Sequence, residues 1–297
     1  MITFAKVITI EETESIMKKN EELLDDLLTL AFAEDVGDGD VTTLSTIPAD
    51  EQGIQRLIIK EEGVLSGVEV ARKVFEKFDP SMKMTLFIKD GEHVKPGDIA
   101  FEVEGSVRSL LQTERTMLNI MQRMSGIATI TAKYQDKLKG LKTKVLDTRK
   151  TTPGMRILEK EAVKTGGGAN HRMGLHDMIL IKDNHVDFAG GITKAVEAAK
   201  KYCKETGRDL KIEVEVRNTD EINEALAAGV DRIMLDNFTP ERTREAVKLI
   251  NGATEVESSG GITLDTLREY GECGVDYISV GALTHSVKGL DMSFKAV

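Results

Sequence analysis

Polar and charged residues follow the end of every apolar strand that the second half of the sequence predicts. These strand exits are residues 147–152, 182–185, 213–217, 236–237, 258–261 and 281. A buried charge needs a partner, and in barrels of alternating strands and helices the functional site lies where the strands end. We therefore predict that these residues form one common functional site.

The positive half of this predicted site contains five side chains, Arg149, Lys150, His171, Arg172 and Lys182. Arginine binds carboxylates through a planar two-pronged fork, whereas lysine acts as a point charge for phosphates. Residues 144–185 hold eight lysines and arginines against five acids, in a chain whose net charge is −10. This balance favours a small anionic ligand over a nucleic acid, and a solvated basic face is the alternative.

Two carboxylates, Glu215 and Asp236, end neighbouring predicted strands. They could hold Mg²⁺, bind ribose hydroxyls or stabilise a cationic sugar carbon. The alternative is that each carboxylate pairs with a nearby cation such as Lys182. Both arrangements are compatible with an enzyme that has not yet bound its substrate.

A glycine-rich strand exit predicts a phosphate site. Ser259, Gly260 and Gly261 precede a helix predicted over residues 263–270, whose free N–H groups would face an anion. Gly281 follows the next predicted strand, and phosphate sites after the last strands are frequent in barrels. Taken alone, Ser-Gly-Gly is more often a turn.

Short apolar strands alternate with amphipathic helices from about residue 143 onward. We predict strands at residues 143–146, 178–181, 211–216, 232–235, 254–257 and 277–280, and helices at residues 153–164, 192–206, 219–228 and 240–250, with Pro153 at the first helical position. Such alternation indicates an α/β fold with a parallel sheet or barrel. A full eight-stranded barrel needs about 200 residues and this segment has roughly 140, so we predict a reduced α/β barrel of six to seven strands.

The first part of the chain predicts a mixed α/β unit. It contains helices at residues 21–32 and 68–78 and strands at residues 54–59, 82–88 and 99–103. A further helix over residues 106–124 has its apolar side chains on one face. Arg115 lies toward the other side of this helix, where its spacing alone indicates an ordinary solvated arginine.

Composition narrows the class of protein. No apolar run reaches the roughly 18 residues that a membrane span needs, and residues 1–20 lack the apolar core of a secretory signal, so we expect a cytoplasmic protein. Cys203 and Cys273 are each isolated in the sequence, so we do not expect a disulfide bond. His171, His176 and His185 do not have the spacing of a zinc site.

Eight motifs occur in order along the chain. They are Glu34-Asp35-Val36-Gly37-Asp38-Gly39-Asp40, Thr113-Glu114-Arg115-Thr116, Asp147-Thr148-Arg149-Lys150-Thr151, Gly167-Gly168-Ala169-Asn170-His171-Arg172, Ile181-Lys182-Asp183-Asn184-His185, Glu213-Val214-Glu215-Val216, Leu235-Asp236-Asn237 and Ser259-Gly260-Gly261. Taken together, these motifs resemble the quinolinate phosphoribosyltransferase family. The resemblance implies an N-terminal α/β sandwich over residues 1–112, completed by residues 284–297, and a catalytic α/β barrel over residues 113–283.

The resemblance also implies a reaction and a role for each site residue. Quinolinate and phosphoribosyl pyrophosphate would give nicotinate mononucleotide, pyrophosphate and CO₂, with Mg²⁺ as cofactor and a homodimer or larger assembly as the working form. Quinolinate would be held by Arg149, His171 and Arg172 and by Arg115 of the partner subunit. Lys150 and Lys182 would meet the charges of the substrate and the pyrophosphate. Glu215 and Asp236 would face the ribose and Mg²⁺. The 5′-phosphate would be bound by Ser259, Gly260, Gly281 and His285.

Three other functions remain as alternatives. Lys182 could form a Schiff base in an aldolase-like barrel enzyme, but the cluster of Arg149, Lys150 and Arg172 favours an anionic substrate. A non-catalytic paralogue of the same fold would have altered the quinolinate grip. A simple anion-binding module would not need paired carboxylates opposite the cations.

Overall fold

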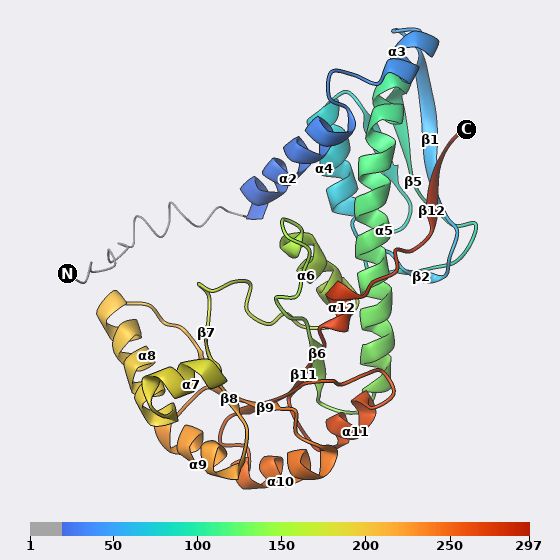
Figure 1. Cartoon of the computed structure of the whole chain (residues 1–297). Coiled ribbons are helices and arrows are strands. Elements are labelled where there is room, and N and C mark those ends of the chain that lie inside the picture. Colours follow the sequence, from blue (N-terminus) through green and yellow to red (C-terminus); the bar gives the residue numbers. More distant parts are fainter. Residues whose placement is uncertain (1–19) are drawn as a thin grey trace, which may run out of the picture.

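The structure is a computed structural model that describes residues 20–297, so most of the segment examined for a secretory signal lies outside the described residues. Two parts of the chain lie at opposite ends of one long helix, α5 (Val107–Lys137), as Figure 1 shows. Among the described residues, no helix is both long and apolar enough to cross a membrane.

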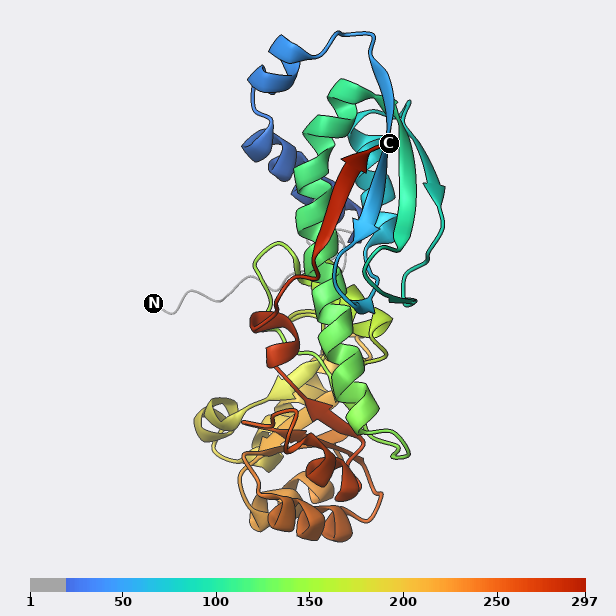
Figure 2. The same ribbon diagram turned by 90° about the vertical axis from the view of Figure 1, so that its right-hand side faces the viewer.

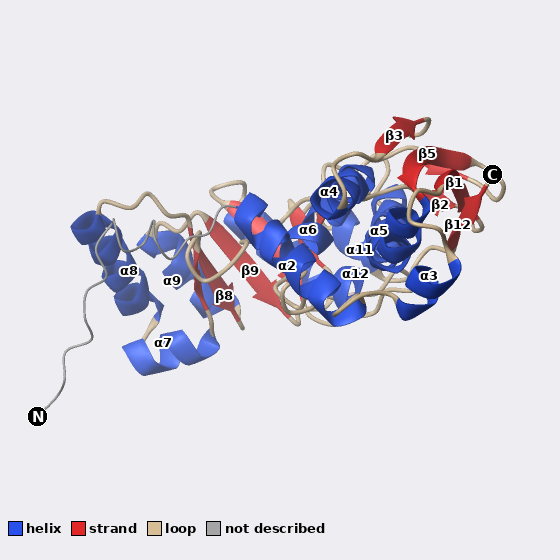
Figure 3. Ribbon diagram, turned by 90° about the horizontal axis from the view of Figure 1, so that it is seen from above, coloured by secondary structure: helices blue, strands red, loops and turns tan. Residues whose placement is uncertain are grey.

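The N-terminal part is a four-stranded antiparallel sheet with helices packed against it, which confirms the expected α/β sandwich (Figure 3). Its elements are α2 (Asn20–Asp35), α3 (Val41–Thr46), β1 (Gln52–Ile59), β2 (Gly63–Val64), α4 (Val68–Phe78), β3 (Lys83–Leu86), β4 (His93–Val94) and β5 (Ile99–Ser106). The strand order is β12-β1-β5-β3, so β12 (Met292–Ala296) from the end of the chain completes this sheet (Figure 2). Phe75, Phe101 and Phe294 pack together with ring centroids 6.0–6.2 Å apart, which joins the two ends of the sequence in one core.

The helix α5 extends further than the sequence analysis predicts. It ends at Lys137 rather than at residue 124, and its second half contacts the barrel. The prediction ended too early because residues 125–132 are all small or β-branched, which weakens the apolar periodicity, although five of these eight are buried. The domain boundary expected between residues 112 and 113 falls inside this continuous helix.

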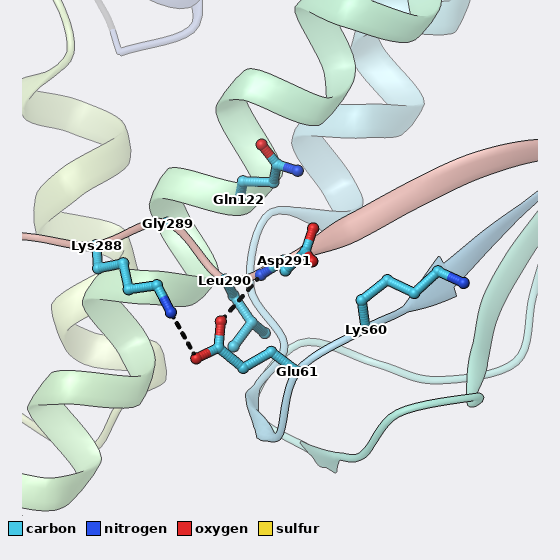
Figure 4. Close-up of a pocket in the computed structure, with 7 residues that line it drawn as sticks. All are labelled: Lys60, Glu61, Gln122, Lys288, Gly289, Leu290 and Asp291. Carbon is cyan, nitrogen blue, oxygen red and sulfur yellow. Dashed lines mark hydrogen bonds and ion pairs between the residues drawn. The ribbon is translucent and has the colours of Figure 1, made fainter.

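The C-terminal segment crosses α5 at Gly126, where a Cβ atom would lie 2.3 Å from the Lys288 carbonyl oxygen. The Leu290 N–H donates to the Gln122 carbonyl oxygen at 2.9 Å, and Lys288 Nζ lies 2.9 Å from Glu61 Oε1. These contacts border a surface hollow of about 450 Å³ (Figure 4). They fix the point from which the chain returns to the N-terminal sheet as β12.

The second part is a six-stranded parallel sheet with helices along its outside, which confirms the reduced α/β barrel (Figure 1). Its strands are β6 (Lys144–Leu146), β7 (Ile179–Ile181), β8 (Ile212–Val216), β9 (Arg232–Asp236), β10 (Glu255–Ser259) and β11 (Tyr277–Ser279), and its helices are α6 (Arg156–Thr165), α7 (Asp183–Ala189), α8 (Ile192–Thr206), α9 (Thr219–Ala228), α10 (Pro240–Ile250), α11 (Leu267–Glu272) and α12 (Ala282–His285). The strand order is β6-β11-β10-β9-β8-β7. Because all pairs are parallel, the carboxyl ends of the strands meet at one edge.

Two barrel helices begin later than predicted. Pro153 is not the first residue of α6, because Pro153 and Gly154 form a turn in which Gly154 has a φ of +81°. The helix α11 begins only after a turn in which the Thr263 N–H donates to Thr266 Oγ1 at 3.0 Å. Hydroxyl side chains of this kind compete with the helical backbone for its donors. The predicted helix directly behind Ser-Gly-Gly is therefore wrong.

Candidate active site

A cavity of about 860 Å³ opens at the carboxyl ends of the barrel strands. Eleven of the twelve site residues that the sequence predicts line this cavity. They are Arg149, Lys150, His171, Arg172, Lys182, Glu215, Asp236, Ser259, Gly260, Gly281 and His285. The twelfth residue, Arg115, is exposed on α5 and does not line the cavity of its own chain.

Two arginines form the cationic wall of the cavity. Arg149 follows β6, and Arg172 lies on the glycine-rich loop between α6 and β7, where its guanidinium donates to the Met178 carbonyl oxygen at 3.4 Å. Burial, and next the positive charge of Arg149, lower the pKa of Arg172. Two like charges that disfavour each other in this way are stabilised by an anion that binds between them.

A buried ion pair between Asp147 and Lys160 holds this loop against the barrel. Asp147 follows β6, Lys160 lies on α6, and both side chains are fully buried. The His171 N–H donates to Asp147 Oδ1 at 2.9 Å, and Lys160 Nζ donates to the His171 carbonyl oxygen at 3.1 Å. Burial raises the pKa of Asp147 and lowers that of Lys160, while their mutual attraction opposes both shifts. The pair thereby fixes the backbone from which Arg172 reaches the cavity.

Two carboxylates face the cavity from neighbouring strands. Glu215 lies on β8 and Asp236 ends β9. Glu215 Oε2 lies 2.9 Å from Lys182 Nζ, so the expected alternative of pairing with Lys182 holds for this carboxylate. Asp236 Oδ2 accepts from the Asn237 side chain at 2.7 Å and makes no ion pair within the described part of the chain. Carboxylate oxygens are the ligands that Mg²⁺ prefers, so this pair fits such an ion.

Glycines shape the exits of β10 and β11. Gly260 has a φ of +99°, and a Cβ atom there would lie 2.2 Å from Asn237 Oδ1, so a side chain at this position would collide. Gly281 follows β11 and directly precedes α12, and a Cβ atom there would lie 3.1 Å from both His285 and Lys150. Backbone that can be approached this closely suits a phosphate group.

A buried charged cluster adjoins the cavity, and two of its members, His171 and Glu257, line it. His171 Nε2 lies 3.0 Å from Glu213 Oε2 and 3.5 Å from Glu257 Oε2. Both carboxyl groups are fully buried, and burial raises the pKa of Glu213 to about 7 and that of Glu257 to about 8. Glu257 is not among the site residues predicted from the sequence. The signal that could have found it is the Glu-Val-Glu pattern that occurs in β10 as it does in β8.

This fold and this cavity define an α/β-barrel enzyme that acts on phosphorylated, anionic substrates. Within that class, the chain belongs to the quinolinate phosphoribosyltransferase family. The model of the quinolinate phosphoribosyl transferase C-terminal domain matches residues 127–295, and that of the N-terminal domain matches residues 40–125. The two matches meet within α5.

Named relatives agree with this assignment over nearly the whole chain. "Quinolinate phosphoribosyltransferase [decarboxylating] 1b" of Nicotiana tabacum is 44% identical over 285 residues, which cover 91% of this chain and 81% of the relative. "Probable nicotinate-nucleotide pyrophosphorylase [carboxylating]" of Bacillus subtilis is 43% identical over 274 residues, which cover 92% and 93%. The crystal structure of NadC from Streptococcus pyogenes matches with a TM-score of 0.88 and 41% identity, covering 95% and 99%. The resemblance noted from the motifs is confirmed.

Proposed function

We propose that this chain transfers the phosphoribosyl group of phosphoribosyl pyrophosphate to the ring nitrogen of quinolinate and releases CO₂, which yields nicotinate mononucleotide and pyrophosphate for NAD biosynthesis. The observation that carries this proposal is the meeting of a cationic wall, two carboxylates and glycine-shaped strand exits in one cavity. Quinolinate is a dicarboxylate and its cosubstrate carries phosphate groups, so these substrates need all three features. Membership of the family supports the same reaction.

The two arginines of the cationic wall bind the carboxylates of quinolinate in this proposal. The fork of a guanidinium matches a carboxylate, and Arg149 and Arg172 line the cavity together with His171. Arg115 is exposed and does not line the cavity of its own chain, so it would act in the cavity of a second copy. The working assembly would then be a homodimer or a larger oligomer.

The remaining cavity residues bind phosphoribosyl pyrophosphate. Ser259, Gly260, Gly281 and His285 hold the 5′-phosphate, Lys150 and Lys182 meet the pyrophosphate, and Glu215 and Asp236 face the ribose and hold Mg²⁺. When bound there, Mg²⁺ neutralises charge on the pyrophosphate oxygens. The carboxylates support this assignment because they offer oxygen ligands on adjacent strands.

The chemistry follows from the placement of charge. The quinolinate ring nitrogen bonds to the sugar carbon that bears pyrophosphate, and the bond from that carbon to pyrophosphate breaks. Glu215 and Asp236 offset positive charge on the sugar, while Lys150 and Lys182 stabilise the leaving group. The carboxylate beside the ring nitrogen then leaves as CO₂ because the positive nitrogen accepts the electrons left behind, and a proton takes its place. The protein contributes mainly orientation and charge.

Product formation tests the proposal. We expect nicotinate mononucleotide and CO₂ from quinolinate, phosphoribosyl pyrophosphate and Mg²⁺, and no mononucleotide when nicotinate replaces quinolinate. Absence of product while phosphoribosyl pyrophosphate still binds would indicate a non-catalytic paralogue. An aldolase-like function is no longer supported, because the family is a different one and Lys182 Nζ lies against Glu215.

Two further points belong to this proposal. The barrel, residues 113–283, would carry the catalytic residues, while residues 1–112 with 284–297 would serve as a supporting or substrate-covering domain and would add His285 to the 5′-phosphate site. The protein would act in the cytoplasm, which cell fractionation with an antibody to the chain would test.

A further inference from the structure

Two successive residues of α6, Glu159 and Lys160, are charged and fully buried. Lys160 pairs with Asp147, as described above, whereas Glu159 pairs with Arg123 of α5. Arg123 Nε donates to Glu159 Oε1 at 2.6 Å. Neither Arg123 nor Glu159 lines the cavity, so contact with substrate does not account for this second buried pair.

The pair of Arg123 and Glu159 holds the end of the segment 147–152, which follows β6. Glu159 Oε2 accepts the backbone N–H of Thr152 at 3.2 Å, and Arg123 Nη2 donates to Thr152 Oγ1 at 2.9 Å. Lys160 holds the beginning of the same segment through its own ion pair. Adjacent charges of α6 therefore fix both ends of the segment that carries two cations into the cavity.

The same guanidinium also reaches the helix α12. Arg123 Nη2 donates to the Thr284 carbonyl oxygen at 2.9 Å. The Thr284 side chain is fully buried, and its Oγ1 donates to the Lys150 carbonyl oxygen at 2.8 Å and lies 3.3 Å from the Gly281 carbonyl oxygen. The Thr284 hydroxyl thus lies between the backbones of two residues that line the cavity.

The spacing of these two backbones matters because three residues meet closely there. A Cβ atom at Gly281 would lie 3.1 Å from Lys150 Cδ and 3.1 Å from the ring of His285. A shift of either backbone would change the room that is left for an anion. A misplacement of about 1 Å in a site of this kind can cost roughly 100-fold in rate.

Stability alone does not explain the pair of Arg123 and Glu159. Apolar residues of similar volume often stabilise a core as well as a buried ion pair does, or better. Apolar residues cannot, however, hold separate segments by directed hydrogen bonds. A guanidinium has five donors in one plane, and here it joins α5 to α6, to the segment 147–152 and to α12.

We propose that Arg123, Glu159 and Thr284 are positioning residues for the binding of phosphoribosyl pyrophosphate. The ion pair fixes the two segments behind the cavity, and the Thr284 hydroxyl sets the spacing between Lys150 and Gly281. The three residues act through Lys150 and Gly281 and do not touch the substrate themselves. The inference rests on the proposed function, which assigns the pyrophosphate to Lys150 and the 5′-phosphate to Gly281.

Two substitutions of Thr284 separate its hydroxyl from its bulk. Thr284→Val keeps the shape and removes the donor to Lys150, so we expect the KM for phosphoribosyl pyrophosphate to rise about tenfold while the KM for quinolinate changes less than about twofold. Thr284→Ser keeps the hydroxyl, so both KM values should stay within about twofold of the wild type. Thr243→Val is the matched control, because Thr243 is equally buried and its hydroxyl has no hydrogen-bond partner among the described residues.

A substitution of Arg123 tests the ion pair itself. Arg123→Lys keeps a positive charge opposite Glu159 but loses the planar fork that reaches Thr152 and Thr284 together. We expect the KM for phosphoribosyl pyrophosphate to rise about three- to tenfold, again with little change in the KM for quinolinate. Thermal unfolding of each variant identifies any general loss of the fold.

Three outcomes would overturn the proposal. They are a wild-type KM for phosphoribosyl pyrophosphate in Thr284→Val, an equal rise of both KM values in that variant, and a loss in Thr284→Ser as large as that in Thr284→Val. If the wild-type protein binds phosphoribosyl pyrophosphate but makes no product, the proposed function fails. The positioning role is then tested by titration calorimetry with phosphoribosyl pyrophosphate and Mg²⁺, and an unchanged Kd in Thr284→Val would refute it.

Discussion

Lys182 Nζ lies 2.9 Å from Glu215 Oε2, across the neighbouring strands β7 and β8 at the mouth of the cavity. A cation assigned to the pyrophosphate and a carboxylate assigned to the ribose and Mg²⁺ therefore neutralise each other before any substrate binds. Substrate and metal must replace this contact, and each partner then meets an opposite charge on the ligand. In the site without substrate, neither Lys182 nor Glu215 therefore carries an uncompensated charge.

The metal requirement can be tested at this pair and at its neighbour. Asp236→Asn and Glu215→Gln each remove a charged oxygen ligand, so we expect the half-saturating Mg²⁺ concentration to rise about tenfold in each variant. Activity measured over a Mg²⁺ series gives this value, and a chelator should abolish activity in the wild type. Glu221→Gln on α9 is the control, since its partner is Arg217 and it does not line the cavity. An unchanged Mg²⁺ dependence in both variants would refute the assigned metal ligands.

The cationic wall predicts that loss of its arginines weakens the binding of one substrate far more than that of the other. In Arg149→Ala and Arg172→Ala we expect quinolinate binding to weaken about 10- to 100-fold, because each loses a charged hydrogen bond to a carboxylate. Binding of phosphoribosyl pyrophosphate should change far less. Titration calorimetry with each ligand measures both, and Arg217→Ala, an exposed arginine outside the cavity, is the control. Equal losses for the two ligands would contradict the grip that we assign.

Gly260 and Gly261 form a matched pair of neighbouring positions. Both have a positive φ, but only at Gly260 would a Cβ atom collide, 2.2 Å from Asn237 Oδ1 and 2.9 Å from its backbone nitrogen. We expect Gly260→Ala to reduce kcat/KM for phosphoribosyl pyrophosphate at least about tenfold. Gly261→Ala meets no atom within 4 Å and should cost only about 1 kcal/mol of backbone strain. Steady-state kinetics with thermal unfolding separates the two effects, and equal kinetic losses would argue against a closely approached backbone.

Much of the fold was predictable because the barrel alternation is strong. The helices at residues 192–206, 219–228 and 240–250 have the predicted bounds, since each is clearly amphipathic and is followed by a left-handed residue that ends it. The start of α6 and the start of α11 were not predictable, because turns at Pro153-Gly154 and at Thr263–Thr266 take the first backbone donors. The end of α5 depended on contacts with the barrel that lie far away in the sequence.

Site residues that follow the ends of strands were predictable from the sequence, whereas site residues within strands were less so. Charged residues after strand ends meet in one cavity because parallel strands share a carboxyl edge, so Arg149, Lys182 and Asp236 could be placed together in advance. Glu257 was missed, because the Glu-Val-Glu pattern of β10 does not itself show that Glu257 is buried while Glu255 stays partly exposed. The role of Arg115 depends on a second subunit and stays a prediction.

The buried acids predict how stability depends on pH. Burial raises the pKa of Glu213 to about 7 and that of Glu257 to about 8, above an unfolded value near 4.5, so the folded state keeps a proton that the unfolded state releases. Stability from this pair is therefore complete below about pH 4.5 and is lost as pH rises through 7 to 8, by up to about 1.4 kcal/mol per pH unit for one proton. The lowered pKa of His171 acts in the opposite direction, mainly below pH 6.5.

Chemical denaturation from pH 7 to 8.5 measures this dependence where histidine contributes least. We expect the free energy of unfolding to fall with pH in the wild type and in Glu255→Gln, and to fall less steeply in Glu257→Gln. A wild-type free energy that rises with pH across this range would show that the pair is already ionised in the folded protein.

The return of β12 to the N-terminal sheet affects the order of events during synthesis. While a ribosome is still making the barrel, β1 has β5 beside it but an open edge on its other side, since its second partner is made only at residues 292–296. Phe75 and Phe101 likewise lack their packing partner Phe294 until the end of synthesis. The first part of the nascent chain is therefore exposed to aggregation until the last has emerged, so a premature stop near the end would damage the domain made first.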